Sequence, residues 1–413
     1  MEIGEIQSVE ILLDSGAHIL HSSLKALISL RDREKAQNIV GILAKTLARR
    51  QRELWKFALQ NLPTEIVQSL GLDENYPLDD KTFHVVQALK KWRIPVPAVY
   101  DTVEPGPVYH LECLSPSWAQ VLYDAGFVKT NSPLHGRTPL MCVCDNFWET
   151  NFNDMLALIN WFQDHGASIY TSLPISGNRR SINRGSGCGL EVDVPSLTYP
   201  TLHYFTESLG FISANEVRTL DRFQTSGKNL FLFSKLLEDK TTDPCHCYCV
   251  VNGCTPASKF ISGVYTTVLL WEDDITNYVI KYMRSIESTI LDKTEIDIAF
   301  DFIRVITFER LGMRHTCCRY TMRTRNRRFR RYEVPNLLEV AEVEEIREED
   351  RYLAELLDTL VEEFERKFRE LDVPLSQFVE EYLWPRVDEA MEEQDEVSSE
   401  DLHAIRDIGV VLS

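Results

Sequence analysis

The sequence predicts an all-α protein in which stacked helix pairs over residues 1–210 precede a helical C-terminal region with a cysteine-rich loop. Three observations predict this class. Amphipathic stretches in the first half end in glycine at similar positions. Residues 333–413 are acidic, and their apolar side chains recur at three- and four-residue spacing. Between these regions, four cysteines and a histidine fall within positions 245–254.

Composition narrows the class of protein. With 413 residues the chain is long enough for two or three domains. A formal net charge of −19 argues against general attraction to nucleic acid or to an anionic membrane surface. The N-terminus is acidic, unlike a signal peptide, and the apolar runs are far shorter than the roughly 20 residues that span a bilayer. We therefore expect an intracellular protein, cytoplasmic or nuclear, with reduced thiols and no membrane partner.

Three similar stretches indicate helices that are closed by glycine. They read "VEILLDSGAHI", "WAQVLYDAGFVK" and "LALINWFQDHGASI". The left-handed backbone that closes a helix suits a residue without Cβ, so we expect it at Gly16, Gly126 and Gly166.

Two other stretches, "GRTPLMCVC" and "YPTLHYF", predict helix starts. Thr138 is expected to cap a helix through its hydroxyl, with Pro139 in the first turn, where a missing N–H costs nothing. Twelve residues separate Gly126 from Thr138. Both stretches resemble the Thr-Pro-Leu-His opening of an ankyrin repeat, and twelve residues is the usual link between such repeats.

The first 210 residues thus resemble a divergent ankyrin-repeat protein of the type found in filamentous fungi. The resemblance implies helix pairs stacked into a curved solenoid whose concave face binds other proteins. The chain departs from the repeat pattern in several places. The turn after Gly16 is shortened, extra residues fill 144–154, and Ser172–Leu197 forms a long insertion. Cys142 and Cys144 occupy positions that usually carry alanine.

The remaining segments are predicted as further helices. Residues 36–71 indicate two or three helices with a break at Pro63, whereas the prolines between 95 and 107 indicate an extended connector. Helical patterns also cover 207–233 and 285–312, the second closed by Gly312. One apolar helix face is formed by Leu353, Leu356, Leu357, Leu360, Phe364 and Phe368. The predicted regions are 1–210 (ankyrin-like), 211–332 (cysteine-rich) and 333–413 (acidic helices).

The cysteine-rich stretch "DPCHCYCVVNGCTP" predicts a metal site. If it is extended, its three alternating cysteines share one face, and the Asn252-Gly253 turn returns the fourth cysteine to them. The stretch "RHTCC" adds a histidine and two cysteines. Structural zinc takes four such ligands in a tetrahedron, commonly from two separated pairs. The candidate ligands are Cys245, Cys247, Cys249, Cys254, His315, Cys317 and Cys318.

Other interpretations of the cysteines stay open. Free cysteines are often simply buried, disulfides are disfavoured in a reducing compartment, and a catalytic thiol needs a base within hydrogen-bond reach. His246 follows Cys245 and precedes Cys247, but neighbours on an extended chain point to opposite faces. We therefore predict no catalytic residues and no enzyme activity.

The arginine-rich run "RYTMRTRNRRFRRY", at 319–332, is the last feature with a functional interpretation. The acidic helices that follow favour intramolecular pairing, and nuclear import or nucleic-acid binding are the alternatives. The sequence thus predicts an intracellular protein-interaction scaffold with structural zinc, of which a transcription coregulator is one form. A thiol-dependent enzyme and a nucleic-acid-binding protein are the alternative functions.

Overall fold

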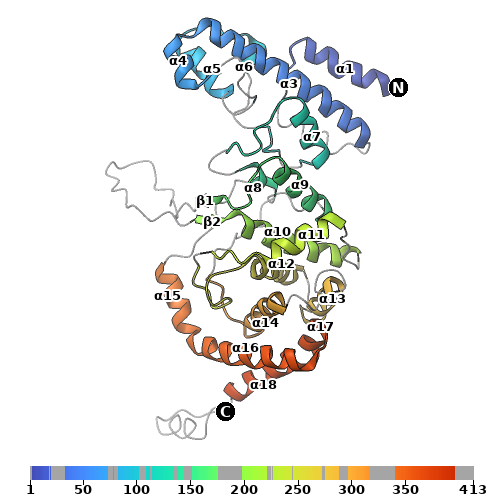
Figure 1. Ribbon diagram of the computed structural model, residues 1–413, viewed down its shortest axis with the longest axis vertical. Coiled ribbons are helices and arrows are strands. Elements are labelled where there is room, and N and C mark those ends of the chain that lie inside the picture. Colours follow the sequence, from blue (N-terminus) through green and yellow to red (C-terminus); the bar gives the residue numbers. More distant parts are fainter. Residues whose placement is uncertain are drawn as a thin grey trace, which may run out of the picture. The chain divides into compact units, whose positions relative to one another are not determined.

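The residues described by the computed structural model are mostly helical (Figure 1). It describes residues 2–17, 19, 33–72, 78, 82–101, 108–111, 114–133, 138–143, 151–174, 198–220, 225, 227–243, 245–271, 275–287, 296–316 and 340–395. Two three-residue strands, β1 (Ser172–Pro174) and β2 (Thr198–Pro200), form a small sheet beside the helices. The predicted all-α class is confirmed. Among the described helices, none combines the length and apolarity that a membrane span requires.

The chain divides into two compact units. Unit 1 contains 1–173 and 200–205, and unit 2 contains 174–199 and 206–413. The helix α10 (Thr201–Leu220) therefore begins in unit 1 and continues in unit 2. The sequence-based division at 210 and 332 stays a prediction.

Unit 1 is organised around its longest helix, α3 (Arg33–Asn61). This helix contacts α1 (Glu2–Asp14), α4 (Thr64–Leu70), α5 (Thr82–Lys91), α6 (Ala98–Asp101) and α7 (Pro116–Asp124). Pro63 separates α3 from α4, so the predicted break is confirmed. The connector predicted as wholly extended contains the short helix α6, so that prediction is wrong at 98–101.

Two arginines of α3 close the ends of neighbouring helices. The Arg50 guanidinium donates hydrogen bonds to the Leu13 and Ala17 carbonyls at the end of α1, at 2.6 and 2.7 Å. Arg52 donates to the Ala125 carbonyl at the end of α7, at 3.0 Å. Both cations lie at the C-terminal ends of helices, where the helix dipole is negative. They join helices that are distant in sequence.

The predicted glycine closures are confirmed. Gly16, Gly126 and Gly166 have φ of +92°, +110° and +84°, directly after α1, α7 and α9 (Phe152–Asp164). The helix α8 (Pro139–Val143) begins at the predicted proline. Capping by the Thr138 hydroxyl is a wrong prediction, because that buried oxygen has no hydrogen-bond partner. The Met141 N–H, from which a capping hydroxyl would accept, donates to the Thr138 carbonyl at 3.0 Å instead.

The segment that follows α7 binds the end of α9. The Thr130 hydroxyl donates to the His165 carbonyl at 2.9 Å, and the Asn131 amide donates to the Gly166 carbonyl at 3.1 Å. Between the helices, the Trp161 indole donates to Gln120 at 2.9 Å. Successive glycine-closed helices are therefore connected both by their side chains and by the turn between them.

Unit 2 is built on α12 (Pro256–Trp271) and α14 (Ile296–Arg310). The first contacts α11 (Gly227–Glu238) and α13 (Ile275–Glu287), and the second contacts α16 (Arg351–Leu371) and α18 (Trp384–Asp395). The chain passes from α15 (Val340–Glu349) through α16 to α17 (Leu375–Phe378) and the π-helical turn η2 (Val379–Leu383). Helices α13 and α14 cover the two ends of the predicted 285–312 helix, and 288–295 lie outside the described residues.

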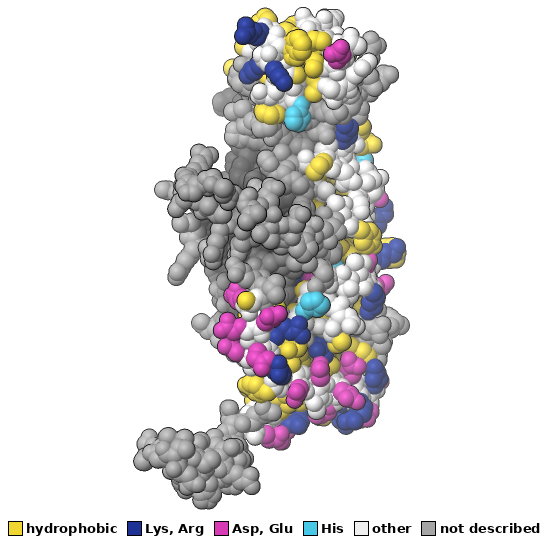
Figure 2. Space-filling model, turned by 90° about the vertical axis from the view of Figure 1, so that its left-hand side faces the viewer, with side chains coloured by type: hydrophobic (Ala, Val, Ile, Leu, Met, Phe, Trp, Pro, Cys, Tyr) yellow, Lys and Arg dark blue, Asp and Glu magenta, His cyan; other side chains and the backbone are white. Residues whose placement is uncertain are grey.

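The predicted apolar face of α16 is confirmed in its main part. Leu353, Leu357, Leu360 and Phe364 are buried, whereas Leu356 and Phe368 are half-buried. The opposite surface of the C-terminal helices is charged, and acidic side chains alternate there with basic ones (Figure 2). Arg310 and Asp388, for example, form a bidentate ion pair between α14 and α18. Part of the acidic charge of these helices is therefore neutralised within unit 2.

Candidate metal centre

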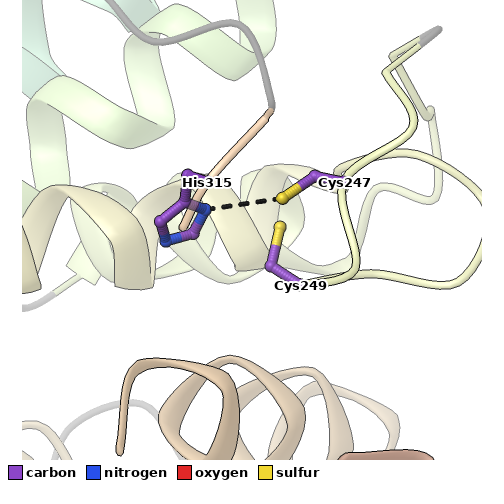
Figure 3. Close-up of side chains that lie close together, drawn as sticks. All are labelled: Cys247, Cys249 and His315. Carbon is purple, nitrogen blue, oxygen red and sulfur yellow. Dashed lines mark hydrogen bonds between the residues drawn. The ribbon is translucent and has the colours of Figure 1, made fainter. Parts of the chain in front are cut away.

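A thiol and imidazole group lies where the loop between α11 and α12 meets the end of α14. The ligand atoms of Cys247, Cys249 and His315 all lie within 4.8 Å of one another. The Cys247 Sγ is 3.7 Å from the His315 Nδ1, and the Cys249 side chain points to the same place (Figure 3). Three of the predicted ligands, from both cysteine clusters of the sequence, are thus brought together.

His315 is oriented by its neighbours in α14. Gly312, with φ of +69°, closes this helix as predicted and turns the chain back. The ring of His315 contacts the Phe308 ring, with centroids 4.5 Å apart. Its Nε2 lies 2.6 Å from the Glu309 carboxylate, to which an Nε2–H donates. That bond directs the Nδ1 lone pair toward Cys247, the arrangement commonly found for metal-bound histidines.

The cysteine loop is attached to the helices around it. Arg304 on α14 donates to the Tyr248 carbonyl at 3.0 Å and to Asp358 on α16 at 2.8 Å. The Tyr248 hydroxyl donates to the Arg347 carbonyl on α15. The backbone N–H of Thr316 donates to the Cys247 Sγ at 3.4 Å. The position of Cys247 is therefore determined by contacts of its loop with α14 and α15 and with the segment after α14.

A second group contains Asp243, Cys245 and Cys254, whose ligand atoms also lie within 4.8 Å of one another. The Cys254 Sγ is 3.2 Å from that of Cys245 and 3.9 Å from that of Cys249. The return of Cys254 to the cluster through the turn at Gly253 is confirmed. The loop itself turns at 248–250 rather than continuing as a strand, so the alternating cysteines divide between two groups.

Burial separates these thiols from solvent to different degrees. Cys247, Cys249 and Cys254 are buried, Cys245 is half-buried, and all four are free cysteines. The Tyr265 side chain, whose hydroxyl is affected by the charge of Glu309, is also buried. Burial raises the pKa of the Tyr265 hydroxyl well above its ordinary range, and the charge of Glu309 raises it further. A metal bound here would be shielded from solvent and bound mainly by sulfur.

Several predicted features fall outside the described residues. They are Cys317, Cys318 and the arginine run at 319–332. Arg314, which precedes this run, pairs with Glu349, and its backbone N–H donates to Asp350 at 2.9 Å. This basic residue therefore pairs with the acidic helices, in the manner expected for the whole run.

Glu309 and Asp243 were not among the predicted site residues. Both have a sequence signal: Glu309 lies in the last turn of the helix that precedes His315, and Asp243 lies two residues before the first clustered cysteine. No family model matches the sequence, and comparisons with curated proteins and with solved structures also give no match.

Proposed function

We propose that this protein is a helical protein-interaction scaffold of the ankyrin type whose second unit is stabilised by a structural zinc ion. The buried group of Cys247, Cys249 and His315 carries the proposal. Thiolates and imidazole are the donors that zinc prefers. Ligand atoms of a tetrahedral zinc site lie about 3.3 to 3.8 Å apart when its bonds are about 2.0 to 2.3 Å long. The 3.7 Å between Cys247 and His315 matches this edge.

A structural zinc needs a fourth ligand. Cys317 follows His315 by two residues, and we propose it as the fourth ligand from its place in the sequence. Cys254 is the described alternative, but its sulfur lies closer to Cys245 than to Cys249. We expect Cys317→Ser to abolish zinc binding and Cys254→Ser to retain it.

Elemental analysis tests the zinc site directly. Protein purified under reducing conditions without added metal is expected to contain about one zinc per chain. Cys247→Ser should lower the zinc content to near zero, because it removes one of the thiolate ligands. Cys142→Ser is the matched control, since Cys142 is a buried free cysteine of unit 1. A metal-free chain with reduced thiols would contradict the proposal.

One observation favours a thiol-dependent enzyme as the second candidate. A nucleophile, a base and an orienting carboxylate lie in sequence here: the Cys247 thiol contacts the His315 ring, and the ring contacts the Glu309 carboxylate. However, a substrate must reach the nucleophile, and Cys247 is 3% exposed. Iodoacetamide distinguishes the two functions. We expect Cys247 to be alkylated only after chelation, whereas rapid alkylation of the native protein, with Cys247→Ser still folded, would indicate the enzyme.

The scaffold part of the proposal is supported by unit 1. Its helices α7 and α9 pack through Trp161 and Gln120, and the turn after α7 binds the end of α9. Large apolar side chains are exposed in the segments after these two helices, Val128 at 44% and Tyr170 at 58%. Exposed apolar groups on successive turns suit the binding of a protein partner. A transcription coregulator is one form of this function.

Affinity purification of the full chain from its own cells tests the scaffold. We expect specific proteins to co-purify with the wild-type chain and to be lost with the double variant Val128→Ser and Tyr170→Ser. Phe231→Ser, which changes an exposed side chain of unit 2, is the control and should retain them. Equal recovery with all three chains would contradict binding through these turns.

A further inference from the structure

The second cysteine group contains two thiols whose approach is determined by one carboxylate. Cys245 and Cys254 have their sulfur atoms 3.2 Å apart. The backbone N–H groups of both residues donate to the same Asp243 oxygen, Oδ1, at 3.3 and 2.7 Å. The ends of the loop are thus held together next to the sulfur pair.

The backbone of the loop is closed at the same place. The Asp243 N–H donates to the Cys254 carbonyl at 3.1 Å. Gly253 has φ of +94°, and a Cβ at this position would lie 2.1 Å from the Asp243 carbonyl oxygen. Because any other residue would collide there, the close approach of residues 243 and 253 requires glycine.

The pair is poorly suited to hold a metal of its own. The Asp243 carboxylate lies 3.9 Å from the Lys259 ammonium, and both side chains are fully buried. A cation at Asp243 would meet this buried positive charge. The sulfur separation is also shorter than the edge of about 3.8 Å that two thiolates of one tetrahedral zinc require. The two sulfur atoms are in contact, and a shift of about 1 Å brings them to the roughly 2.0 Å of a disulfide bond.

We propose that Cys245 and Cys254 form a reversible disulfide when a hydroperoxide oxidises them. Two S–H bonds and the peroxide O–O bond break, one S–S bond forms, and both protons pass to oxygen to give an alcohol and water. Cys245 is half-buried, so the oxidant reaches this sulfur first, and the buried Cys254 completes the bond. The disulfide closes the loop that carries Cys247 and Cys249 and leaves His315 and these two thiols in place.

This inference goes beyond the proposed function, because the disulfide forms whether or not zinc is bound. The test uses the full chain purified under reducing conditions and then treated with tert-butyl hydroperoxide. We expect a loss of two free thiols per chain, a Cys245–Cys254 cross-linked peptide in the mass spectrum, and reversal by dithiothreitol. Cys245→Ser should lose the cross-link, whereas Cys142→Ser should retain it. A cross-link between other cysteines, or an unchanged thiol count, would overturn the inference.

Metal analysis of the same samples separates this inference from the zinc proposal. A constant zinc content during cross-linking is expected, and zinc loss in step with the cross-link would show that the pair belongs to the metal site. A chain that forms the cross-link but contains no zinc overturns the zinc proposal alone. A zinc-loaded chain that never forms the cross-link overturns this inference alone.

Discussion

Replacement of Gly263 by alanine is expected to destabilise unit 2 by about 3 kcal/mol or more. A Cβ at Gly263 on α12 would lie 2.0 Å from the Glu207 carbonyl oxygen and 3.0 Å from the Phe211 nitrogen on α10. From the other side, a Cβ at Gly210 would lie 1.9 Å from the Phe260 carbonyl oxygen. The two helices therefore touch backbone to backbone, and an added methyl group requires one helix to move. Urea unfolding, followed by circular dichroism, measures the change.

A matched control separates overpacking from helix propensity. Gly41 lies in α3, where an added Cβ would have its nearest contact 4.0 Å away, at Val121. Gly41→Ala should stabilise unit 1 by about 0.5 to 1 kcal/mol, because alanine is the better helix former. If Gly263→Ala also stabilised the protein, the backbone-to-backbone contact between α10 and α12 would be contradicted.

The local features of this fold were predictable from the sequence. The break at Pro63 and the closures at Gly16, Gly126 and Gly166 follow from the backbone limits of single residues, so they need no knowledge of distant contacts. The buried face of α16 follows from its spacing. The Thr138 hydroxyl does not cap α8, because the Met141 N–H that it would accept from donates to the Thr138 carbonyl instead.

The contacts between helices were not predictable in this way. The role of Gly263 depends on the helix placed opposite it, and its sequence environment resembles that of any small residue in a buried helix. Arg50 and Arg52 bind the ends of α1 and α7, and the helical spacing of 36–71 gives no sign of these partners. Tertiary packing determines these partners, and the local spacing of residues does not predict them.

For the metal centre, the sequence supplied the residue types and the structure supplied the grouping. The cysteines and His315 were predictable as metal ligands from their residue types, because thiols and imidazoles that are clustered in a sequence commonly bind zinc. The division into two groups depends on the turn at 248–250, which breaks the alternation. Glu309 and Asp243 were missed because carboxylates are common in this acidic chain, and neither is unusual until its partner is known.

Removal of the proposed zinc ion is expected to destabilise unit 2 strongly. Zinc binding in small zinc domains contributes about 10 to 16 kcal/mol, and that free energy is folding free energy. The loop is hydrogen-bonded to α14 through Arg304 and to α15 through Tyr248. Unfolding of the loop therefore also loosens these two helices. In a strong chelator, or with Cys249→Ser, amides in 243–254 and 340–350 should exchange much faster with deuterium. Mass spectrometry of peptides measures this exchange.

Unit 1 provides the internal reference for the same experiment. Its helix α3 is stabilised by contacts within the unit, so peptides from 33–61 should keep their exchange protection in the chelator. Restoring zinc should return the protection of 243–254 in the wild-type chain but not in Cys249→Ser. If the loop kept its protection from exchange in the chelator, its cysteines would be buried core residues that bind no metal. The bond between Glu309 and His315 would then be a structural hydrogen bond rather than the support of a metal ligand.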